Sequence, residues 1–361
     1  MAPLNVSTSL STPIVTFVPH LPPVSPAPVS ASPGGSADLP SLRLPTEKEL
    51  KAEIAHVLNK QLNADLLKWV DGYAQVGKRN LYLWKWVRQG VEVTTLSCVD
   101  PELFDFACDT KVLGVVLDVL LDDIADQKRD IGLLEQLLDL PFDSQRKRLR
   151  EAPPEERAYA EFTIDVWEEI KRRTRQLPLF KRYSALWRYD YLQLFNAMRY
   201  SSMINQDIAL LNLAEHDLYL PHNMHIMISS TVDLMCSPSF NQHELGTLRD
   251  AVWHAQCMGR IGNLVTTWER ELGDADYTSG VYARAVAEGN ITIQDLLDHD
   301  VQAIAAAIKG GGHEQFFLQR WAQYRQRLVE LAPRVRSVEL TRLLTGYERL
   351  IRLHLGSRGY K

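Results

Sequence analysis

The sequence predicts an all-α protein, a single bundle of about ten or more helices. Apolar residues recur at helical spacing almost throughout the chain from Thr46 onward, and helix start and stop signals punctuate that pattern. Alternating apolar and polar runs typical of strands are absent, as are repeats of 20–50 residues. A chain of 361 residues, 45% of them apolar and 24% charged, can bury a large core. Long helices packed in this way can surround a cavity.

Residues 1–45 differ sharply from the rest of the chain. Ten of the eighteen prolines fall here amid Ser, Thr, Val and Ala, and the first arginine or lysine is Arg43. Such a composition cannot bury enough apolar surface to offset the entropy lost on ordering, and it lacks the basic residues of secretory and mitochondrial leaders. We therefore expect a disordered Pro/Ser-rich tail at 1–45, followed by one domain at 46–361.

The domain begins with clear helix signals. "TEKE" (46–49) reads as a capping box, in which Thr46 caps the helix and Glu49 reaches back to it. The run at 100–126 starts with Asp100 as the N-cap and Pro101 at the first helical position. The turn signals "APP" (152–154), "SPS" (237–239) and "KGGG" (309–312) separate later helices. We expect these at about 155–175, 179–206, 215–235, 241–272, 293–308, 313–330 and 334–355.

Charge and cysteine content narrow the classes of function. A net charge of -5 and a pI near 6.1 give no reason to expect nucleic acid or an anionic membrane surface as a partner. No run approaches the 18 apolar residues of a membrane span. The four cysteines are scattered without a CxxC pair, which favours a reducing cytoplasm over disulfides or zinc. The sequence leaves a homodimer open.

The stretch "LDVLLDDIADQKRD" (117–130) places Asp118, Asp122, Asp126 and Asp130 four residues apart in an otherwise apolar helix. Like charges at this spacing repel by roughly 0.2–0.5 kcal/mol per pair on an exposed helix. A solvated acidic face is the simplest interpretation. The apolar residues "VLGVV" before the stripe instead indicate a buried helix whose acidic end lies at a cavity rim. Carboxylate oxygens there would suit Mg²⁺.

A second polar line lies about 140 residues later in "GRIGNLVTTWERELGD" (259–274). Asn263, Thr267 and Glu271 follow one another at i, i+4 and i+8, so an amide oxygen, a hydroxyl and a carboxylate share one helix face. An amphipathic helix with scattered polar residues would give the same pattern. Neither line contains Cys or His, which favours Mg²⁺ over zinc or iron.

Together these motifs resemble the class I terpene synthases in their microbial single-domain form. "DDIAD" (122–126) looks like the aspartate-rich motif of that family. The Asn263, Thr267, Glu271 line looks like its N-x-x-x-S/T-x-x-x-E motif, and Arg270 matches the basic residue that usually precedes the glutamate. The resemblance covers roughly residues 50–361 and implies the class I terpenoid synthase fold, a single-domain helical bundle that encloses a cavity.

The resemblance also implies an activity, that of a terpene cyclase, a Mg²⁺-dependent carbon–oxygen lyase acting on a prenyl diphosphate. Three Mg²⁺ ions would be held by Asp122, with Asp126 as a further candidate, and by Asn263, Thr267 and Glu271. The C–O bond would break, diphosphate would leave and the carbocation would cyclise. We favour a C20 substrate slightly over a C15 substrate.

The predicted anion site combines Arg270 with Arg358 and Tyr360 of "GSRGY" (356–360). The last two resemble the arginine–tyrosine pair with which the family closes on diphosphate, although Gly359 separates them here. Apolar walls and aromatic faces should surround the carbocation. Phe104 and Trp187 are the first candidates for substrate contact, with core packing as the alternative; Tyr191, Phe195, Trp253 and Tyr347 are the others.

Three further expectations follow from the resemblance. The family usually has a diphosphate-sensing arginine 46 residues before the Asn of the second motif, where this chain has Asp217. Either another base replaces it, with His222, His225 and Arg199 as candidates, or the chain manages without one. The two histidines could also pair on a metal or simply hydrogen-bond. We expect a helix kink near Ser229–Thr231. We also expect the Gly- and Asp-rich loop 272–280 to be poorly anchored without ligand.

Two alternatives remain at the level of sequence. A chain-elongating trans-prenyltransferase would share the fold and the first motif, but such enzymes carry a second D-D-x-x-D, which this chain lacks. A helical binding module would use the acidic helix against a basic partner. The sequence does not determine the product.

Overall fold

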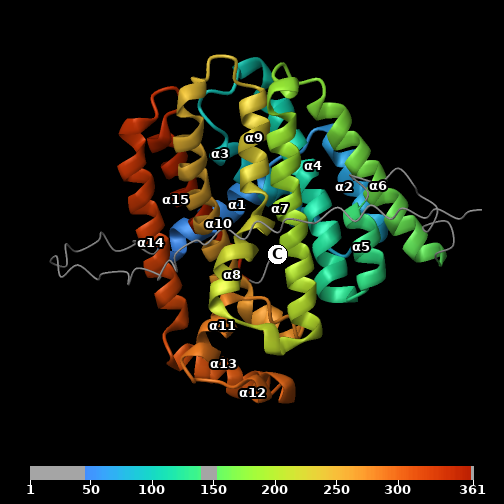
Figure 1. Cartoon of the computed structure of the whole chain (residues 1–361), viewed down its shortest axis with the longest axis vertical. Helices are drawn as coiled ribbons and strands as arrows, with labels where there is room; N and C mark the ends of the chain where they lie inside the picture. The colour runs from blue at the N-terminus through green and yellow to red at the C-terminus, as the bar shows by residue number, and fades with distance from the viewer. Residues whose placement is uncertain (1–44, 140–152, 359–361) are drawn as a thin grey trace, which may run out of the picture. The chain divides into compact units, whose positions relative to one another are not determined.

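Helices make up the regular structure of residues 45–139 and 153–358, the part of the chain that the structure, a computed structural model, describes (Figure 1). No strand occurs in these ranges, so the all-α prediction is confirmed. Residues 1–44 of the predicted tail, and Tyr360, lie outside the described residues. The helices are α1 (Glu47–Asn59), α2 (Ala64–Val76), α3 (Leu81–Thr94), α4 (Phe104–Asp122), α5 (Ile131–Asp139), α6 (Pro154–Thr174), α7 (Phe180–Gln206), α8 (Leu213–Tyr219), α9 (Ile226–Met235), α10 (Leu245–Gly273), α11 (Gly280–Ala287), α12 (Ile293–Asp298), α13 (Val301–Gly310), α14 (His313–Leu331) and α15 (Leu340–Gly356).

The helix starts follow the predicted caps. The Thr46 amide donates to the Glu49 carboxylate at 2.7 Å, and the Glu49 amide donates to Thr46 Oγ1 at 3.3 Å, which completes the capping box of α1. Asp100 accepts a hydrogen bond from the Glu102 amide at 3.0 Å and begins a short 3₁₀ turn that leads into α4. Local side-chain chemistry therefore sets both starts.

Two predicted helices differ from their expected bounds. The segment expected at 293–308 breaks into α12 and α13 because His299 adopts a left-handed conformation (φ 54°) and Asp300 caps the second helix through the Ala303 amide. The helix expected at 334–355 begins only at Leu340.

The predicted kink near Ser229–Thr231 is wrong in position. These residues lie inside α9, and the break between α8 and α9 falls at 220–225 instead. Pro221 lacks the amide that a continuous helix needs, and His225 is left-handed with φ 59°. The break therefore precedes the serines by about one helical turn.

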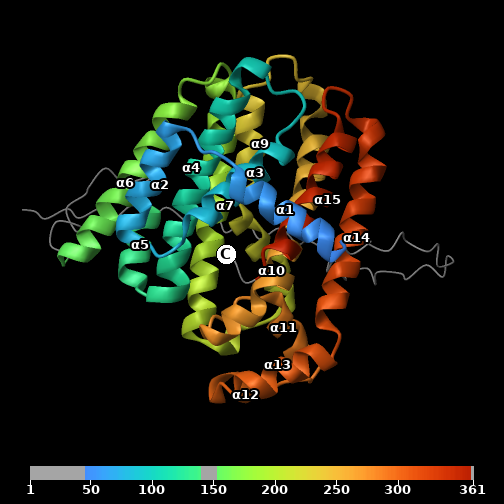
Figure 2. The ribbon, with the colours of Figure 1, turned by 180° about the vertical axis from the view of Figure 1, so that it is seen from behind.

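Five helices form a closed ring. The helix α3 contacts α4, α4 contacts α9, α9 contacts α10, α10 contacts α15, and α15 returns to α3. Outside this ring α7 packs on α9 and α14 packs on α10, as Figure 1 shows. The view from behind shows α1 lying across α3 and α15 (Figure 2). The helices α1, α7 and α14 therefore cover parts of the outer surface of this ring.

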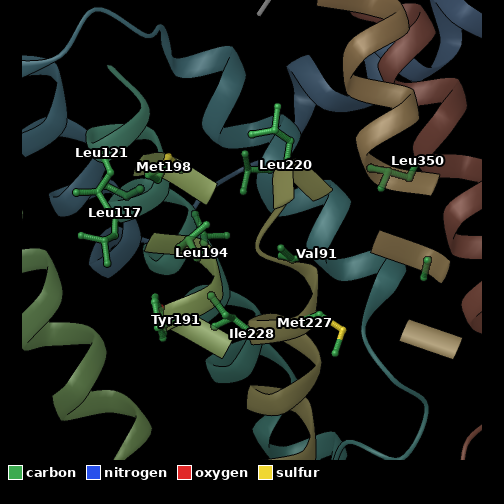
Figure 3. Close-up of a cluster of buried hydrophobic side chains, with 14 of the residues drawn as sticks. Val91, Leu117, Leu121, Tyr191, Leu194, Met198, Leu220, Met227, Ile228 and Leu350 are labelled. Carbon is green, nitrogen blue, oxygen red and sulfur yellow. The ribbon is translucent and has the colours of Figure 1, made fainter. Parts of the chain in front are cut away.

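The apolar core is thickest around α4, which is buried on most of its faces. Figure 3 shows Leu117 and Leu121 of α4 beside Leu194 and Met198 of α7, and all four side chains are buried. Burying each such side chain contributes about 1.5–3 kcal/mol to folding. The opposite face of α4 is consequently the one left to line the central space.

None of the described helices combines the length and apolar content that crossing a bilayer requires. The four cysteines are buried free thiols.

Candidate active site

A cavity of about 600 Å³ lies inside the ring of α3, α4, α9, α10 and α15. Its size falls within the range of small-molecule sites. The residues that line it include, from α3, Leu83, Trp86, Val87, Gly90, Val91 and Thr94; from α4, Val115, Asp118, Val119 and Asp122; from α9, Ile226, Ser229, Ser230 and Asp233; from α10, Val252, Arg260, Asn263, Thr267, Arg270 and Glu271; and from α15, Leu343, Tyr347, Leu350 and His354. Lys78, Arg79, Asp126, Asp274, Asp276 and Thr278 line it from outside these helices.

The cavity has a polar end and an apolar end. Both α4 and α10 run toward the polar end, because their apolar lining residues Val115 and Val252 precede their acidic ones. The Arg270 and Asp274 side chains, 40% and 55% exposed, mark the end that is open to solvent. We call this end the mouth.

The first acidic line sits where α4 changes its winding. The α-helix ends at Asp122, and a π-helical turn follows over Asp123–Lys128. Asp118, Asp122 and Asp126 all line the cavity. Asp123 is buried and bonded by Tyr73 at 2.7 Å and by Arg79 at 3.1 Å. Asp130 leaves the stripe and caps α5 through the Leu133 amide at 2.9 Å.

Crowding of these acids disfavours their charged forms. Burial, and then the like charges on Asp276 and Asp122, raises the pKa of Asp126 well above its usual range. Removal from water also raises the pKa of Asp122, although Arg79, 3.9 Å away, acts against the rise. Burial, followed by the charge on Asp122, raises the pKa of Asp118 well above its usual range. A cation would relieve this repulsion.

The second line has the geometry that its spacing predicts. Asn263, Thr267 and Glu271 lie on one face of the continuous helix α10, and all three line the cavity. Thr267 hydrogen-bonds Glu271 and donates to the Asn263 carbonyl at 2.9 Å. Burial, followed by the charge on Asp276, raises the pKa of Glu271 to about 7. Arg270 also lines the cavity and pairs with Asp274 at 3.1 Å.

Asp276 and Asn205 connect the two lines, and neither could be singled out from the sequence. The Asn205 amide nitrogen, at the end of α7, donates to Asp126 Oδ1 at 3.0 Å and to Asp276 Oδ1 at 3.2 Å. The two carboxylate oxygens thus lie within hydrogen-bonding distance of one shared nitrogen. Ser201 donates to the same oxygen of Asp126 at 3.0 Å. The first line therefore touches the turn that follows the second.

The prediction that the loop 272–280 is poorly anchored is wrong. Asp276, Tyr277 and Ser279 are at most 9% exposed. The Asp276 amide donates to the Glu271 carbonyl at 2.8 Å, and the Tyr277 hydroxyl donates to the Leu296 carbonyl at 2.8 Å. Arg129, next to the π-helical turn, donates to the carbonyl of Ala275 at 2.7 Å. A composition rich in Gly and Asp did not reveal these long-range contacts.

The candidates for the missing arginine do not line the cavity. Arg199 pairs with Glu135 at 2.9 Å on the outer side of α7, and His222 packs on Trp253 with ring centroids 5.0 Å apart. His225 is buried, and its Nε2 forms a hydrogen bond of 3.2 Å with the Tyr191 hydroxyl.

The His225 ring occupies the space that Gly114 leaves on α4. A Cβ built on Gly114 would lie 2.3 Å from this ring. Burial lowers the pKa of His225 to about 3, so this side chain is a neutral packing group. The hydrogen-bonding alternative predicted for the histidines fits His225, and a metal pair does not.

Arg260 supplies the buried guanidinium that sequence reasoning missed. It lies three residues before Asn263 on α10, lines the cavity and is 6% exposed. Its terminal nitrogens donate to Asn263 Oδ1 at 3.2 Å and to the Thr278 carbonyl at 3.1 Å, while its Nε has no partner among the described residues. Because Arg260 precedes Asn263 by three residues, helical periodicity alone places both on the same face of α10.

Most predicted aromatic contacts lie in the core instead of the cavity wall. Trp187 stacks on Trp167 with ring centroids 5.4 Å apart, and Phe104 packs against the core near the start of α4. Neither lines the cavity. Helices such as α7 bury several faces, so an aromatic residue at a buried position need not face the central space. The same holds for Tyr191, Phe195 and Trp253; of the candidates, Tyr347 lines the cavity, joined by Trp86.

Arg358 is also absent from the cavity wall. It donates to the Val265 carbonyl and to Glu314 at 3.2 Å, and it lies 3.6 Å from Glu269, on a face of α10 away from the second line. Its predicted partner Tyr360 lies outside the described residues. The described part of the predicted closing pair is therefore engaged in surface ion pairs.

The donor set at the mouth suits a hard divalent cation. Carboxylate, amide and hydroxyl oxygens make up both lines, and Asp118 Oδ1 in the same wall has no hydrogen-bond partner among the described residues. No three His, Cys, Asp or Glu side chains among those residues are already gathered into a metal site.

Comparisons with known proteins agree with this architecture. No protein-family profile matches the chain, and no curated protein sequence does. The structure of abietadiene synthase from Abies grandis matches with a TM-score of 0.55 and 12% identity over 85% of this chain. The match covers only 37% of that protein, so this chain spans little more than a third of its length.

A smaller neighbour matches along nearly its whole length. Linalool/nerolidol synthase from Streptomyces clavuligerus, solved in complex with 2-fluorogeranyl diphosphate, gives a TM-score of 0.50 and 14% identity over 85% of this chain and 97% of its own. Identities this low establish a likeness of fold alone. This chain has the all-α class I terpene synthase fold.

Proposed function

We propose that this protein is a terpene cyclase that ionises a prenyl diphosphate with Mg²⁺ and cyclises the resulting carbocation. The observation that carries the proposal is the pairing of two oxygen-ligand lines at the mouth of a cavity whose deeper wall is mainly apolar. A diphosphate suits the mouth and a hydrocarbon chain suits the interior. The fold likeness supports the same class of reaction.

The mouth would bind the diphosphate through arginines and cations together. Arg260, Arg270 and Arg79 line the cavity beside the two lines, and the unpartnered Nε of Arg260 is a donor free to meet an anion oxygen. Asp122 and Asp126 on one side, and Asn263, Thr267 and Glu271 on the other, would hold three Mg²⁺ ions. Bound Mg²⁺ would neutralise charge on the leaving diphosphate.

The interior would shape the carbocation and exclude water. Trp86 and Tyr347 present aromatic side chains to the cavity, and Val91, Val115 and Leu350 complete an apolar wall. Aromatic faces stabilise a desolvated cation by up to about 2 kcal/mol each. Water excluded from this space could not quench the cation.

We keep a C20 substrate slightly ahead of a C15 substrate, and a cavity of about 600 Å³ is compatible with either. Arg358 and Tyr360 are secondary candidates for anion contact, behind Arg260 and Arg270, because Arg358 would first have to leave Glu269 and Glu314. A cytoplasmic location is proposed as well, in keeping with four free thiols.

The test is diphosphate release and product analysis with C10, C15 and C20 prenyl diphosphates, each supplied alone with Mg²⁺ and then with EDTA. We expect Mg²⁺-dependent release and a hydrocarbon or alcohol detected by gas chromatography and mass spectrometry. A parallel set with added isopentenyl diphosphate addresses chain elongation. If longer prenyl diphosphates form, and form only in that set, the protein is a prenyltransferase and not a cyclase. If diphosphate is released from none of the substrates, the proposal is wrong.

A further inference from the structure

Among the described acids of the cavity wall, Asp118 alone has a buried carboxylate oxygen without a hydrogen-bond partner. The residue lines the cavity and is 8% exposed, yet its Oδ1 meets no hydrogen-bond donor among the described residues. Asp233, by contrast, is bonded by Lys111 at 2.7 Å and by the Leu96 amide at 3.0 Å. A buried polar atom without a partner costs about 1–3 kcal/mol, so its retention calls for a functional reason.

The position of Asp118 separates it from the predicted cation site. It precedes Asp122 by four residues, which is about 6 Å along the axis of an α-helix. Because α4 runs toward the mouth, Asp118 lies deeper in the cavity than Asp122. Its neighbours on the cavity face of α4 are Val115 and Val119. The carboxyl group thus stands at the junction between the polar mouth and the apolar interior.

We propose that Asp118 is the proton acceptor that ends the carbocation reaction in this cavity. The inference rests on the proposed terpene cyclase function and adds a catalytic residue to it. Of the two described carboxylates deeper in the cavity than Asp122, Asp233 is neutralised by the buried Lys111, whereas Asp118 has an oxygen available.

The step balances without any further reactant. A C–H bond next to the cationic carbon breaks, and its electron pair forms the C=C bond of the product. The proton passes to Asp118 in its carboxylate form, which a neighbouring carbocation favours and which the raised pKa makes a strong base, and the group becomes a neutral carboxyl. After the olefin leaves, the proton is lost to solvent and the carboxylate is restored. General-base groups placed in this way typically contribute 10²–10⁴-fold to a rate.

Asp118→Asn tests the proposal because it keeps the shape of the side chain and removes its ability to accept a proton. We expect the ratio of the wild-type olefin to released diphosphate to fall at least about tenfold. Isomeric olefins or water-quenched alcohols should appear in its place. Asp118→Glu retains a carboxylate and should restore much of that ratio. Asp130→Asn is the matched control, because Asp130 belongs to the same stripe but caps α5.

A binding measurement gives a readout that does not depend on turnover. Dodecyltrimethylammonium, kept below its micelle concentration, mimics a cation on a hydrocarbon chain; Mg²⁺ and diphosphate are included to occupy the mouth. We expect Asp118→Asn to weaken its binding about threefold or more, and Asp130→Asn to leave it unchanged. The bound cation favours the charged form of Asp118 despite its raised pKa, and such a charge counts strongly in a poorly solvated cavity.

Three results would count against the proposal in different ways. An unchanged product pattern in Asp118→Asn overturns it. A parallel loss of diphosphate and olefin with a raised Mg²⁺ requirement also overturns it, by making Asp118 a cation ligand. If the wild-type protein releases no diphosphate from any prenyl substrate, the proposed function fails, and unaltered ammonium binding by Asp118→Asn then removes the cation-facing role as well.

Discussion

The two polar lines at the cavity mouth reach the same place by different backbone routes. The second line lies on the uninterrupted helix α10, so Asn263, Thr267 and Glu271 face the cavity together as their spacing of four requires. The first line crosses from α4 into a π-helical turn between Asp122 and Asp126. A π-helical turn is rare and is frequent at functional sites.

The difference shows how each line is held in place. Regular winding and short-range hydrogen bonds orient the second line. The first line depends on contacts from elsewhere in the chain, because Asn205 and Ser201 of α7 bond Asp126 and Arg79 bonds Asp123. Variants in the two lines should therefore fail in different ways.

The largest effect is expected for Asp122→Asn, which replaces a charged ligand of the first line by a neutral one. Turnover should fall by about 100-fold or more, since even outer partners of metal ligands cost 10–100-fold. The unfolding temperature without ligand should hold or rise, because repulsion between Asp122 and its acidic neighbours is relieved. Asp130→Asn is the control. Wild-type turnover at ordinary Mg²⁺ would remove Asp122 from the site.

In the second line, Glu271→Gln should raise the Mg²⁺ concentration needed for half-maximal turnover by about tenfold or more. Asn263→Ala should do the same, and the double variant should be little worse than either, because both changes empty one site. Asp250→Asn on the same helix is the control, because Asp250 pairs with His254 at 3.3 Å and does not line the cavity. Strictly additive effects of the two changes would mean that the residues act separately.

Asn205→Ala tests the link between the lines. It removes the donor shared by Asp126 and Asp276 and the acceptor of the Tyr277 amide. We expect turnover to fall about tenfold. We also expect weaker Mg²⁺ binding, measured by calorimetry in the presence of diphosphate. Gln206→Ala, at the next and exposed position, should change neither. An unaltered Mg²⁺ affinity in Asn205→Ala would show that the two lines do not depend on this link.

The sequence determines the second line more fully than the first for physical reasons. Helical periodicity is local, so the face shared by Asn263, Thr267 and Glu271 could be predicted, and so could Arg260 three residues earlier. The π-helical turn, Asn205 and Asp276 depend on packing between segments some 70 residues apart. The helix positions were predictable for the same local reason. Which face of α7 looks inward was not, and Trp187 was therefore misplaced.

Acidity offers a smaller but directional test, because the pKa of Glu271 is raised to about 7. Cation binding needs the carboxylate form, so the unfolding-temperature gain from Mg²⁺ with diphosphate should shrink as the pH falls through about 7. Without ligand, the contribution of Glu271 to stability depends on pH in the opposite direction. The folded protein holds this proton up to about pH 7 and the unfolded chain releases it near 4.5, so Glu271 costs stability as the pH rises through that window.

Glu271→Gln removes both of these pH dependences. The difference in unfolding free energy between wild type and variant separates the effect of Glu271 from that of His216. Burial lowers the pKa of His216 to about 4, so His216 destabilises the fold in acid. Identical pH profiles for wild type and variant would show that Glu271 does not titrate near neutrality.

The smallest effect is expected for Arg358→Ala, and it contrasts the outward and inward faces of α10. Arg358 is 42% exposed and pairs with Glu314 and Glu269, and exposed pairs contribute only about 0–1 kcal/mol. Its loss should lower turnover less than about threefold, whereas Arg260→Ala should cost more, because hydrogen bonds to charged groups are worth about 1.5–3 kcal/mol. A far larger effect of Arg358→Ala on the KM for the diphosphate substrate would show that Arg358 leaves its surface partners and reaches the mouth when substrate binds. The anion site would then require a rearrangement of the chain's C-terminal end, and the contrast between the two faces of α10 would hold only for the substrate-free protein.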